Sequence, residues 1–210
     1  NIPLMDNPFL VKQPDYPLLA ANMKDVTDFF LRREDFMAPT MMMTRDGVNI
    51  GFIGLTSDIV ENMHPFLAMG MDFAHGETEH VDIVNQYSQE LREQGADLVV
   101  VMSELGIHKD KRIADKIDSN SVQVFFSAHT HEVVRDPVPS DSGAVLVEAG
   151  NDSYLGKMDF EFDVTEETVE TGRRFRRTTE TITTATLVDM DWTLLDVDDS
   201  VPADPDMQAI

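Results

Sequence analysis

Apolar and polar positions follow one another along the middle of the chain in blocks that suit strands and helices in turn. Val48–Leu55 and residues 98–102 are apolar runs, and the second is apolar on both faces, which is typical of a strand inside a covered sheet. Between them, residues 78–94 have the spacing of an amphipathic helix, with Thr78 as candidate N-cap and Gly95 as the stop. The pattern predicts a strand, a helix and a second strand.

The same alternation continues. Residues 110–117 can form a short helix that buries Ile113, Ala114 and Ile117, and residues 122–126 form the next apolar run. Short links between these blocks predict right-handed crossover units in a layered α/β domain. Upstream, residues 17–21 are a predicted strand, and residues 41–43 open a predicted hairpin whose turn is residues 45–47.

Beyond residue 143 the pattern contains no helix, which predicts an antiparallel ending. The predicted strands are residues 144–148, 157–164, 180–186 and 192–195. Residues 165–171 are predicted to be an acidic, turn-rich loop. The tail after residue 195 carries aspartates and two prolines and predicts a solvated linker.

Composition narrows the classes of partner. The 210 residues suit one domain, and the net charge of −23 argues against a nucleic acid polymer, whose phosphates would be repelled. A phosphate ester remains a possible substrate if bound cations reverse the local field. The absence of cysteine excludes thiolate metal sites in this segment. No apolar run is long enough to span a membrane, so no membrane insertion is expected, and no signal peptide is visible.

Candidate chemistry follows two of the predicted strands. His129 and His131 come directly after residues 122–126, and two histidines one residue apart in an extended loop suit two adjacent metal ions. Glu104 follows residues 98–102 and could ligate a metal, act as a base or bond nearby backbone.

Four other histidines are given no role. His108 is expected to face solvent at a helix start, and His80 to be exposed in the first turn of its helix. His64 and His75 lie in a region of weak pattern.

Four blocks occur in the order seen in bacterial 5′-nucleotidases: residues 16–22, 47–56, 95–103 and 128–131. The chain therefore resembles the 5′-nucleotidase and UDP-sugar hydrolase type of the calcineurin-like metallophosphoesterases. The resemblance implies an α/β fold, a layered β-sandwich flanked by helices (αββα) that is incomplete at the N-terminus. It also implies a partial metallophosphoesterase domain over residues 1–195 and an acidic linker over residues 196–210 toward an absent C-terminal domain.

The resemblance implies a metal-dependent, 5′-nucleotidase-like hydrolase of phosphate esters, acting through two divalent ions of the Zn, Mn, Mg, Fe or Co class. His129 and His131 match the histidines of the family's metal loop, and Glu104 stands where the family has another histidine ligand. Asp6 corresponds to the aspartate that orients the family's catalytic histidine. The other early ligand blocks have no counterpart, so the remainder of the chain would be needed to complete the site.

Two alternatives stay open. One is a non-catalytic module with degenerate metal sites, favoured by Glu104, and the other is a related hydrolase of sulfur esters. The expected partner is a small-molecule nucleotide or phosphate ester. The resemblance implies a periplasmic or extracellular location.

Overall fold

A computed structural model describes residues 16–24, 37–58, 60, 64, 72–173, 176–198 and 200–202. Six strands form a mixed sheet in the order β1-β2-β3-β4-β6-β5, and two long strands form a separate antiparallel hairpin. The strands are β1 Thr40–Arg45, β2 Val48–Leu55, β3 Leu98–Ser103, β4 Val124–Ser127, β5 Val138–Pro139, β6 Val145–Val147, β7 Tyr154–Arg173 and β8 Arg176–Asp196. The helices are α2 Gly76–Glu93 and α3 Ile107–Ala114.

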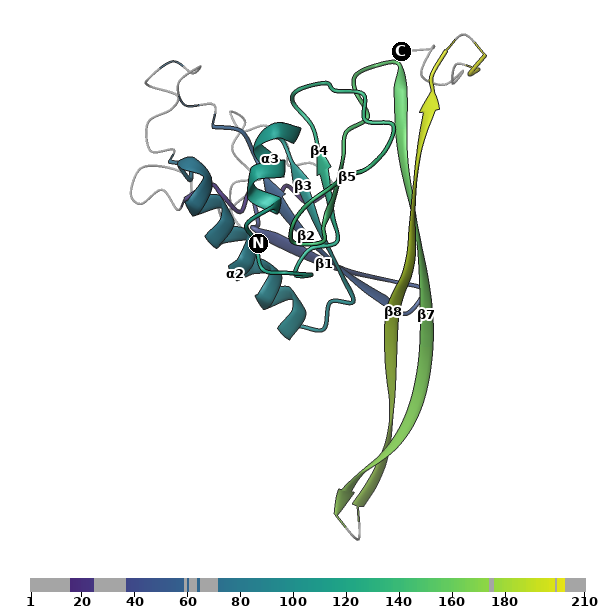
Figure 1. Cartoon of the computed structure of the whole chain (residues 1–210). Helices are drawn as coiled ribbons and strands as arrows, with labels where there is room; N and C mark the ends of the chain where they lie inside the picture. Colours follow the sequence, from purple (N-terminus) through teal and green to yellow (C-terminus); the bar gives the residue numbers. More distant parts are fainter. Residues whose placement is uncertain are drawn as a thin grey trace, which may run out of the picture.

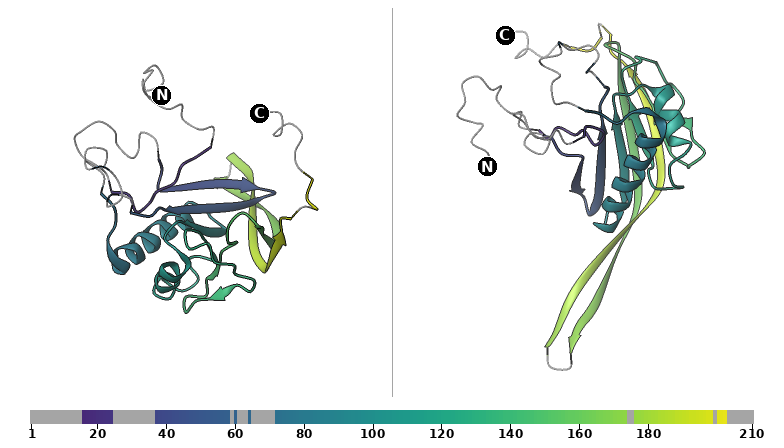
Figure 2. Two further views of the ribbon diagram at one scale, coloured as in Figure 1. Left: turned by 90° about the horizontal axis from the view of Figure 1, so that it is seen from above. Right: turned by 90° about the vertical axis from the view of Figure 1, so that its left-hand side faces the viewer.

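Strand alternation divides the core into two layers. Residues Val99 and Val101 of β3 face α2 and α3 and lie in the larger buried cluster. Their neighbours Leu98 and Val100 belong to a second cluster, which packs against Phe160 and other residues of the hairpin. Figures 1 and 2 show the same arrangement, with the helices on one side of the sheet and the β7–β8 hairpin on the other. The predicted α/β sandwich is therefore confirmed, and residues 98–101 of β3 are buried on both faces.

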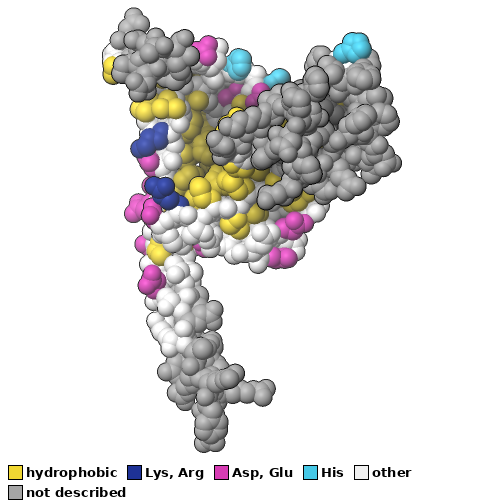
Figure 3. Space-filling view, turned by 180° about the vertical axis from the view of Figure 1, so that it is seen from behind, with side chains coloured by type: hydrophobic (Ala, Val, Ile, Leu, Met, Phe, Trp, Pro, Cys, Tyr) yellow, Lys and Arg dark blue, Asp and Glu magenta, His cyan; other side chains and the backbone are white. Residues whose placement is uncertain are grey.

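The hairpin covers only part of its face of the sheet. Seen from behind, hydrophobic side chains gather on the body beside the hairpin (Figure 3). Met43 of β1 and Met102 of β3 are 43% and 46% exposed, and they pair with Ile50 and Phe126, which belong to the cluster on that face. The two-stranded layer is thus narrower than the six-stranded sheet on which it packs.

Trp192 fastens the hairpin to the body. Its indole Nε1 donates a hydrogen bond of 2.8 Å to the carbonyl of Val134, and its ring centroid lies 6.4 Å from that of Phe126 in β4. Gly156, on the paired strand, lies against the same ring, since a Cβ there would come within 2.1 Å of Cη2. Strand β8 is therefore held close to the loop that follows β4.

The parallel strands β2, β3 and β4 lie close to their predicted positions. Residues 144–148 were predicted to open an antiparallel ending, but β6 pairs parallel with β4, so that prediction was wrong. Both helices begin earlier than expected. α2 begins at Gly76 with His75 as N-cap, so the prediction of Thr78 as N-cap was wrong. The His75 side chain makes no cap bond, and its backbone amide donates a bond of 2.7 Å to the Glu79 carboxylate. α3 begins at Ile107 rather than residue 110, and the three apolar residues predicted to be buried there are buried.

The predicted loop at residues 165–171 was also wrong, because these residues lie inside β7. The two predicted strands at residues 180–186 and 192–195 are parts of the single strand β8. The chain turns between Arg173 and Arg176, the last paired residues, and the hairpin runs far beyond the body (Figure 1). Residues 17–21 form only an isolated bridge, between Leu19 and Ala38.

Gly54 offers a direct test of how the body is packed. A Cβ at Gly54 would lie 2.3 Å from Leu19 Cβ and 2.6 Å from the Leu19 carbonyl, which is backbone and cannot rotate away. We expect Gly54→Ala to lower the free energy of unfolding of the full-length protein by about 3 kcal/mol, measured by urea denaturation. At Gly51 the three atoms nearest to an added Cβ belong to the Leu91 side chain, at 2.9 to 3.2 Å, so Gly51→Ala should lower the free energy of unfolding less than Gly54→Ala does. Equal losses in the two variants would contradict this packing.

Candidate functional site

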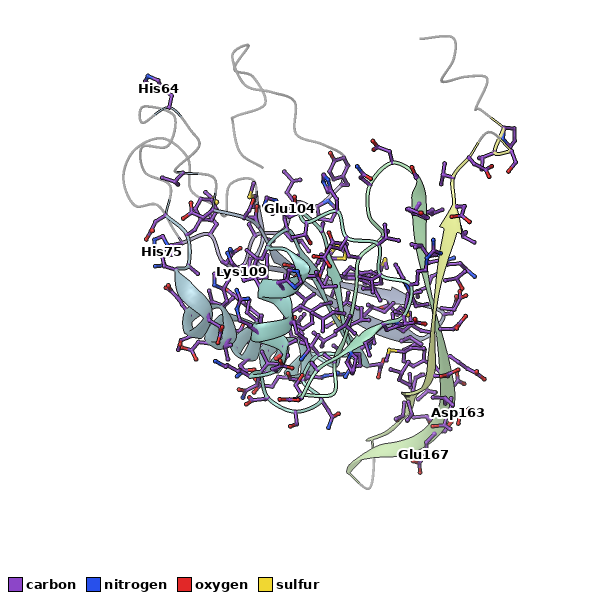
Figure 4. All side chains as sticks on the ribbon, turned by 45° about the horizontal axis from the view of Figure 1, so that its top comes forward. His64, His75, Glu104, Lys109, Asp163 and Glu167 are labelled. Atoms are coloured by element: carbon purple, nitrogen blue, oxygen red, sulfur yellow. The ribbon has the colours of Figure 1, made fainter. Side chains whose placement is uncertain are left out.

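The carboxyl ends of β3 and β4 bring two predicted site residues together. These strands are parallel neighbours, and Ser103 pairs with Ser127 at their ends. Glu104 and His129 follow, and Glu104 Oε1 lies 3.6 Å from His129 Nδ1. Both side chains are about half exposed, at 51% and 57%. Figure 4 shows Glu104 at this end of the sheet, in the position where ligands collect in open α/β sheets.

The loop that carries the two histidines was predicted to be extended, and that prediction was wrong. His129 has φ 83° and His131 has φ 56°, so two non-glycine residues lie in the left-handed region within three positions. Each such residue costs roughly 1 kcal/mol or more, and strain of this kind persists only where the surroundings impose it. The loop geometry is therefore set by its neighbours rather than by local preference.

Glu148 is the main neighbour that imposes this geometry. Its carboxylate is 2% exposed and accepts bonds from Thr130 Oγ1 at 2.7 Å and from the Glu132 amide at 3.2 Å. Thr130 Oγ1 also lies 3.4 Å from the amide of Ile107, which begins α3. One buried carboxylate thus holds the histidine loop, and the threonine ties it to the loop after β3.

Asp110 is the buried residue beneath the other loop. It is 0% exposed, and its Oδ1 accepts a 2.7 Å bond from the Ser103 hydroxyl, which itself accepts from the Leu105 amide. Burial raises the pKa of the Asp110 carboxyl to about 6, although the Ser103 hydrogen bond opposes the shift. Asp110 Oδ2 and Ser127 Oγ are both buried without a hydrogen-bond partner in the described part of the chain.

The sequence did contain a signal for Asp110, which the prediction missed. Positions 107, 110, 114 and 117 share one face of a helix, and the other three residues on that face are apolar. A lone aspartate on such a face has to be buried, and a buried carboxylate needs hydrogen-bond donors. Its closeness to the end of β3 then marks it as a support of the candidate site.

His108 and His80 lie in contrasting surroundings. His108 is exposed, as predicted, and its Nε2 lies 2.8 Å from Glu132 Oε1. The prediction that His80 is exposed was wrong: it is 3% exposed, with Nδ1 2.6 Å from the Gly76 carbonyl and Nε2 3.4 Å from the Asn22 amide. Burial lowers the pKa of the His80 imidazole, which favours the neutral form.

The candidate ligands are not gathered into one group in the described residues. Within those ranges, no three histidine, aspartate or glutamate side chains are grouped so that they could hold an ion together. Asp6, the predicted positioning aspartate, lies outside the described residues. The roles of His129, His131 and Glu104 as ligands remain predictions, supported by the approach of Glu104 to His129.

Comparison with known proteins finds distant relatives. No family model matches the chain. The snake venom 5′-nucleotidase of Gloydius brevicauda is 22% identical over 153 residues, which is 71% of this chain and 24% of that protein. The chain therefore resembles 5′-nucleotidases distantly and spans about a quarter of this relative.

Solved structures agree on the fold. The sulfate thiohydrolase SoxB of Thermus thermophilus matches with a TM-score of 0.60 and 17% identity, over 86% of this chain and 28% of that one. A 5′-nucleotidase precursor from Thermus thermophilus gives 0.56 and 20%, over 82% and 34%. The NAD nucleotidase of Haemophilus influenzae gives 0.55 and 14%, over 87% and 35%. The chain has the fold of one segment of these larger hydrolases.

None of the helices in the described ranges combines the length and apolar character needed to cross a membrane.

Proposed function

We propose that the full-length protein is a metal-dependent hydrolase of phosphate esters, of the 5′-nucleotidase kind. The observation that carries the proposal is the approach of Glu104 to His129, at the ends of adjacent parallel strands in a fold shared with nucleotidases. Acid and imidazole groups left half exposed at such an edge are available to a ligand.

The donor set suits the proposed ions. Imidazole nitrogen binds Zn, Mn, Fe and Co, and a carboxylate oxygen can join it on the same ion. His129, His131 and Glu104 would supply part of a centre for two divalent ions, with other residues of the full chain completing it. When bound, such ions polarise phosphoryl oxygens and lower the pKa of water.

The chain's own residues would prepare the site. Glu148 and Thr130 fix the histidine loop, while Asp110 and Ser103 fix the loop that begins at Glu104. Support of this type typically changes metal affinity or activity by about 10–100-fold when it is removed. The net charge of −23 would repel a free phosphate ester, so cations would also be needed for binding.

The substrate proposed is a small nucleotide or related phosphate ester. Similarity to a venom protein supports the proposed periplasmic or extracellular location. The likeness to a sulfate thiohydrolase keeps a sulfur ester as the alternative substrate, and Glu104 in place of histidine keeps a non-catalytic module as the alternative class.

One assay tests the proposal. The full-length protein, loaded with Mn²⁺ or Zn²⁺, would be given nucleoside monophosphates, UDP-sugars, cyclic nucleotides and a thiosulfonate. We expect phosphate release from at least one nucleotide and its loss after treatment with a chelator. Hydrolysis of the thiosulfonate alone would favour the sulfur-ester hydrolase. Bound metal without turnover of any compound would favour the non-catalytic module.

A further inference from the structure

Two basic side chains beside the candidate site have no carboxylate partner. Most lysine and arginine side chains in the described part of the chain lie within salt-bridge distance of an aspartate or glutamate: Lys24, Arg45, Lys111, Arg112, Lys116 and Lys157. Arg92 instead donates to Gln123 and to the carbonyl of Ala96. Lys109 and Arg135 are exposed, and neither lies that close to a carboxylate of the described residues. In a chain with 39 acidic and 16 basic residues, such unpaired cations are unexpected.

Lys109 belongs to the segment that follows β3. It lies in the first turn of α3, where its amide donates a bond of 3.0 Å to the Gly106 carbonyl. This is the positive end of the helix dipole, where negative charge is the stabilising sign. The amide of Ile107, which begins the same helix, lies 3.4 Å from Thr130 Oγ1, between the two histidines. Figure 4 labels Lys109 on α3 and Glu104 in the loop before it. The stability of α3 therefore gives no reason for a lysine beside the site.

Arg135 lies beyond the histidine loop in sequence and is held next to it in space. Its Cζ lies 5.6 Å from the centre of the Tyr154 ring, a cation–π contact that orients the guanidinium without using its N–H donors. Tyr154 in turn lies beside the loop, because a Cβ at Gly150 would be 3.4 Å from Tyr154 Cδ2 and 3.7 Å from the His131 carbonyl oxygen. The guanidinium is thus oriented near His131, and no described residue occupies its hydrogen-bond donors.

We propose that Lys109 and Arg135 bind negatively charged groups of the substrate other than the phosphate that the metal ions would hold. The inference rests on the proposed function and narrows the substrate to phosphate esters that carry charge beyond the scissile phosphate, such as a nucleoside diphosphate. Lysine and arginine N–H groups bind phosphate oxygens through charge-assisted hydrogen bonds. Neither residue is a candidate metal ligand, so both remain available to the substrate.

The charge of the chain gives these two side chains their weight. The net charge is −23, and Glu104 and Glu132 add exposed carboxylates on the two site loops. A substrate with more than one charged phosphate is repelled there unless cations lie at the site itself. The Debye length is about 8 Å at physiological ionic strength, so basic residues elsewhere on the surface are largely screened. Lys109 and Arg135 are close to the site loops and are not neutralised by a described carboxylate.

Steady-state kinetics with ADP and AMP test the inference in the metal-loaded, full-length protein at physiological ionic strength. Lys109→Gln and Arg135→Gln should each raise the KM for ADP by about tenfold and leave kcat unchanged, because each removes a charge-assisted hydrogen bond to the bound substrate. The KM for AMP, which has no second phosphate, should change by less than about threefold. Lys157→Gln and Arg45→Gln are the matched controls, since they remove the same charges from side chains that are paired with carboxylates, and they should change neither KM.

The tyrosine gives a second test. Tyr154→Leu removes the ring that orients Arg135 and should raise the KM for ADP, whereas Tyr154→Phe keeps the ring and should not. Elemental analysis should show the same metal content in all these variants, because none of them removes a candidate ligand. Equal changes in KM for ADP and AMP, a loss of kcat with no change in KM, or turnover of AMP alone would overturn the inference.

Binding measurements separate this inference from the proposed function. If the protein hydrolyses neither nucleotide, the proposed function fails, and calorimetry then measures the binding of ADP to the Mn²⁺-loaded, full-length protein. Weaker binding of ADP by the double variant Lys109→Gln/Arg135→Gln, with unchanged binding of AMP, would support the inference without catalysis. Binding of ADP that is absent, or equal in the wild type and the double variant, would overturn it.

Discussion

Replacing Asp110 with asparagine should stabilise the full-length protein by up to about 3 kcal/mol at pH 8, and should change its stability little at pH 3. The carboxyl is fully buried, and its pKa rises from 3.8 to about 6, mainly because burial disfavours the charged form. The wild type must bury that charge at pH 8, whereas asparagine is neutral. Asparagine can still accept from Ser103, and its amide can donate to Ser127, which lies near the Asp110 carboxyl and has no partner of its own in the described residues.

The sign of the effect follows from proton uptake. Because the folded pKa exceeds the unfolded one, the folded protein holds a proton between pH 4 and 6 that the unfolded chain has lost. This contribution to stability is complete below the unfolded pKa and is lost as the pH rises through about 6. Roughly half of the loss falls above pH 5, within a range where unfolding is easily measured.

Urea unfolding at pH 5 and pH 8 provides the measurement. Asp110→Asn should flatten the pH dependence, whereas Asp115→Asn should not, because Asp115 is partly exposed and its pKa is lowered by its pairing with Lys111. The same pH dependence in the wild type and Asp110→Asn would show that the buried carboxyl does not titrate in this range. A stabilised variant that also loses activity would identify Asp110 as a residue retained to position the site rather than for stability.

The strands and helices of the body were predictable because buried positions are apolar in the sequence. Strands β2 and β3 are covered by the helix layer on one face and face the second sheet on the other, so both are apolar runs between polar boundaries. The meeting of Glu104 and His129 was predictable for a related reason, since parallel strands end at the same edge. Topology alone brought together two residues that are 25 positions apart.

The distal part of the β7–β8 hairpin was not predictable in the same way. Residues 165–168 are exposed without interruption, and residues 165–171 carry no apolar alternation and resemble a loop in composition. Their threonines favour extended structure, but that preference is weak where side chains do not pack. Long-range backbone pairing with residues 178–184 decides their conformation, and no local pattern records it.

His80 and the histidine loop show a third reason why a prediction was wrong: a tertiary contact overrides the local sequence preference. His80 was expected to be exposed because polar residues usually occupy the first turn of a surface helix. The start of α2 at Gly76 instead brings the ring against Asn22, a residue 58 positions away. The left-handed backbone at His129 and His131 likewise depends on Glu148, and no residue near the histidines in sequence predicts that conformation.

The double variant His129→Ala/His131→Ala should lose most of its bound metal. If the two residues supply one imidazole to each of two ions, the wild type should carry about two divalent ions per full-length chain, and the variant should carry far fewer. Hydrolysis of the preferred substrate should fall by more than about 100-fold, which exceeds the typical loss for a supporting residue such as Thr130. Elemental analysis of the purified proteins and steady-state kinetics provide the two readouts.

The controls separate ligation from folding. His75→Ala removes an exposed histidine at the start of α2, whose ring lies near Asp58 and Asp72 rather than the candidate site, and it should leave metal content unchanged. Thr130→Val removes the hydroxyl that Glu148 accepts from, so it should weaken metal binding without abolishing it. Circular dichroism should show the same fold in all variants, because the His129 side chain is more than half exposed and contributes little to the core.

If the double variant keeps its metal while Thr130→Val loses it, the ions are held elsewhere and the histidine loop serves only as structure. Loss of metal and activity in the double variant alone would instead assign His129 and His131 as ligands and leave Glu104 as the next residue to test.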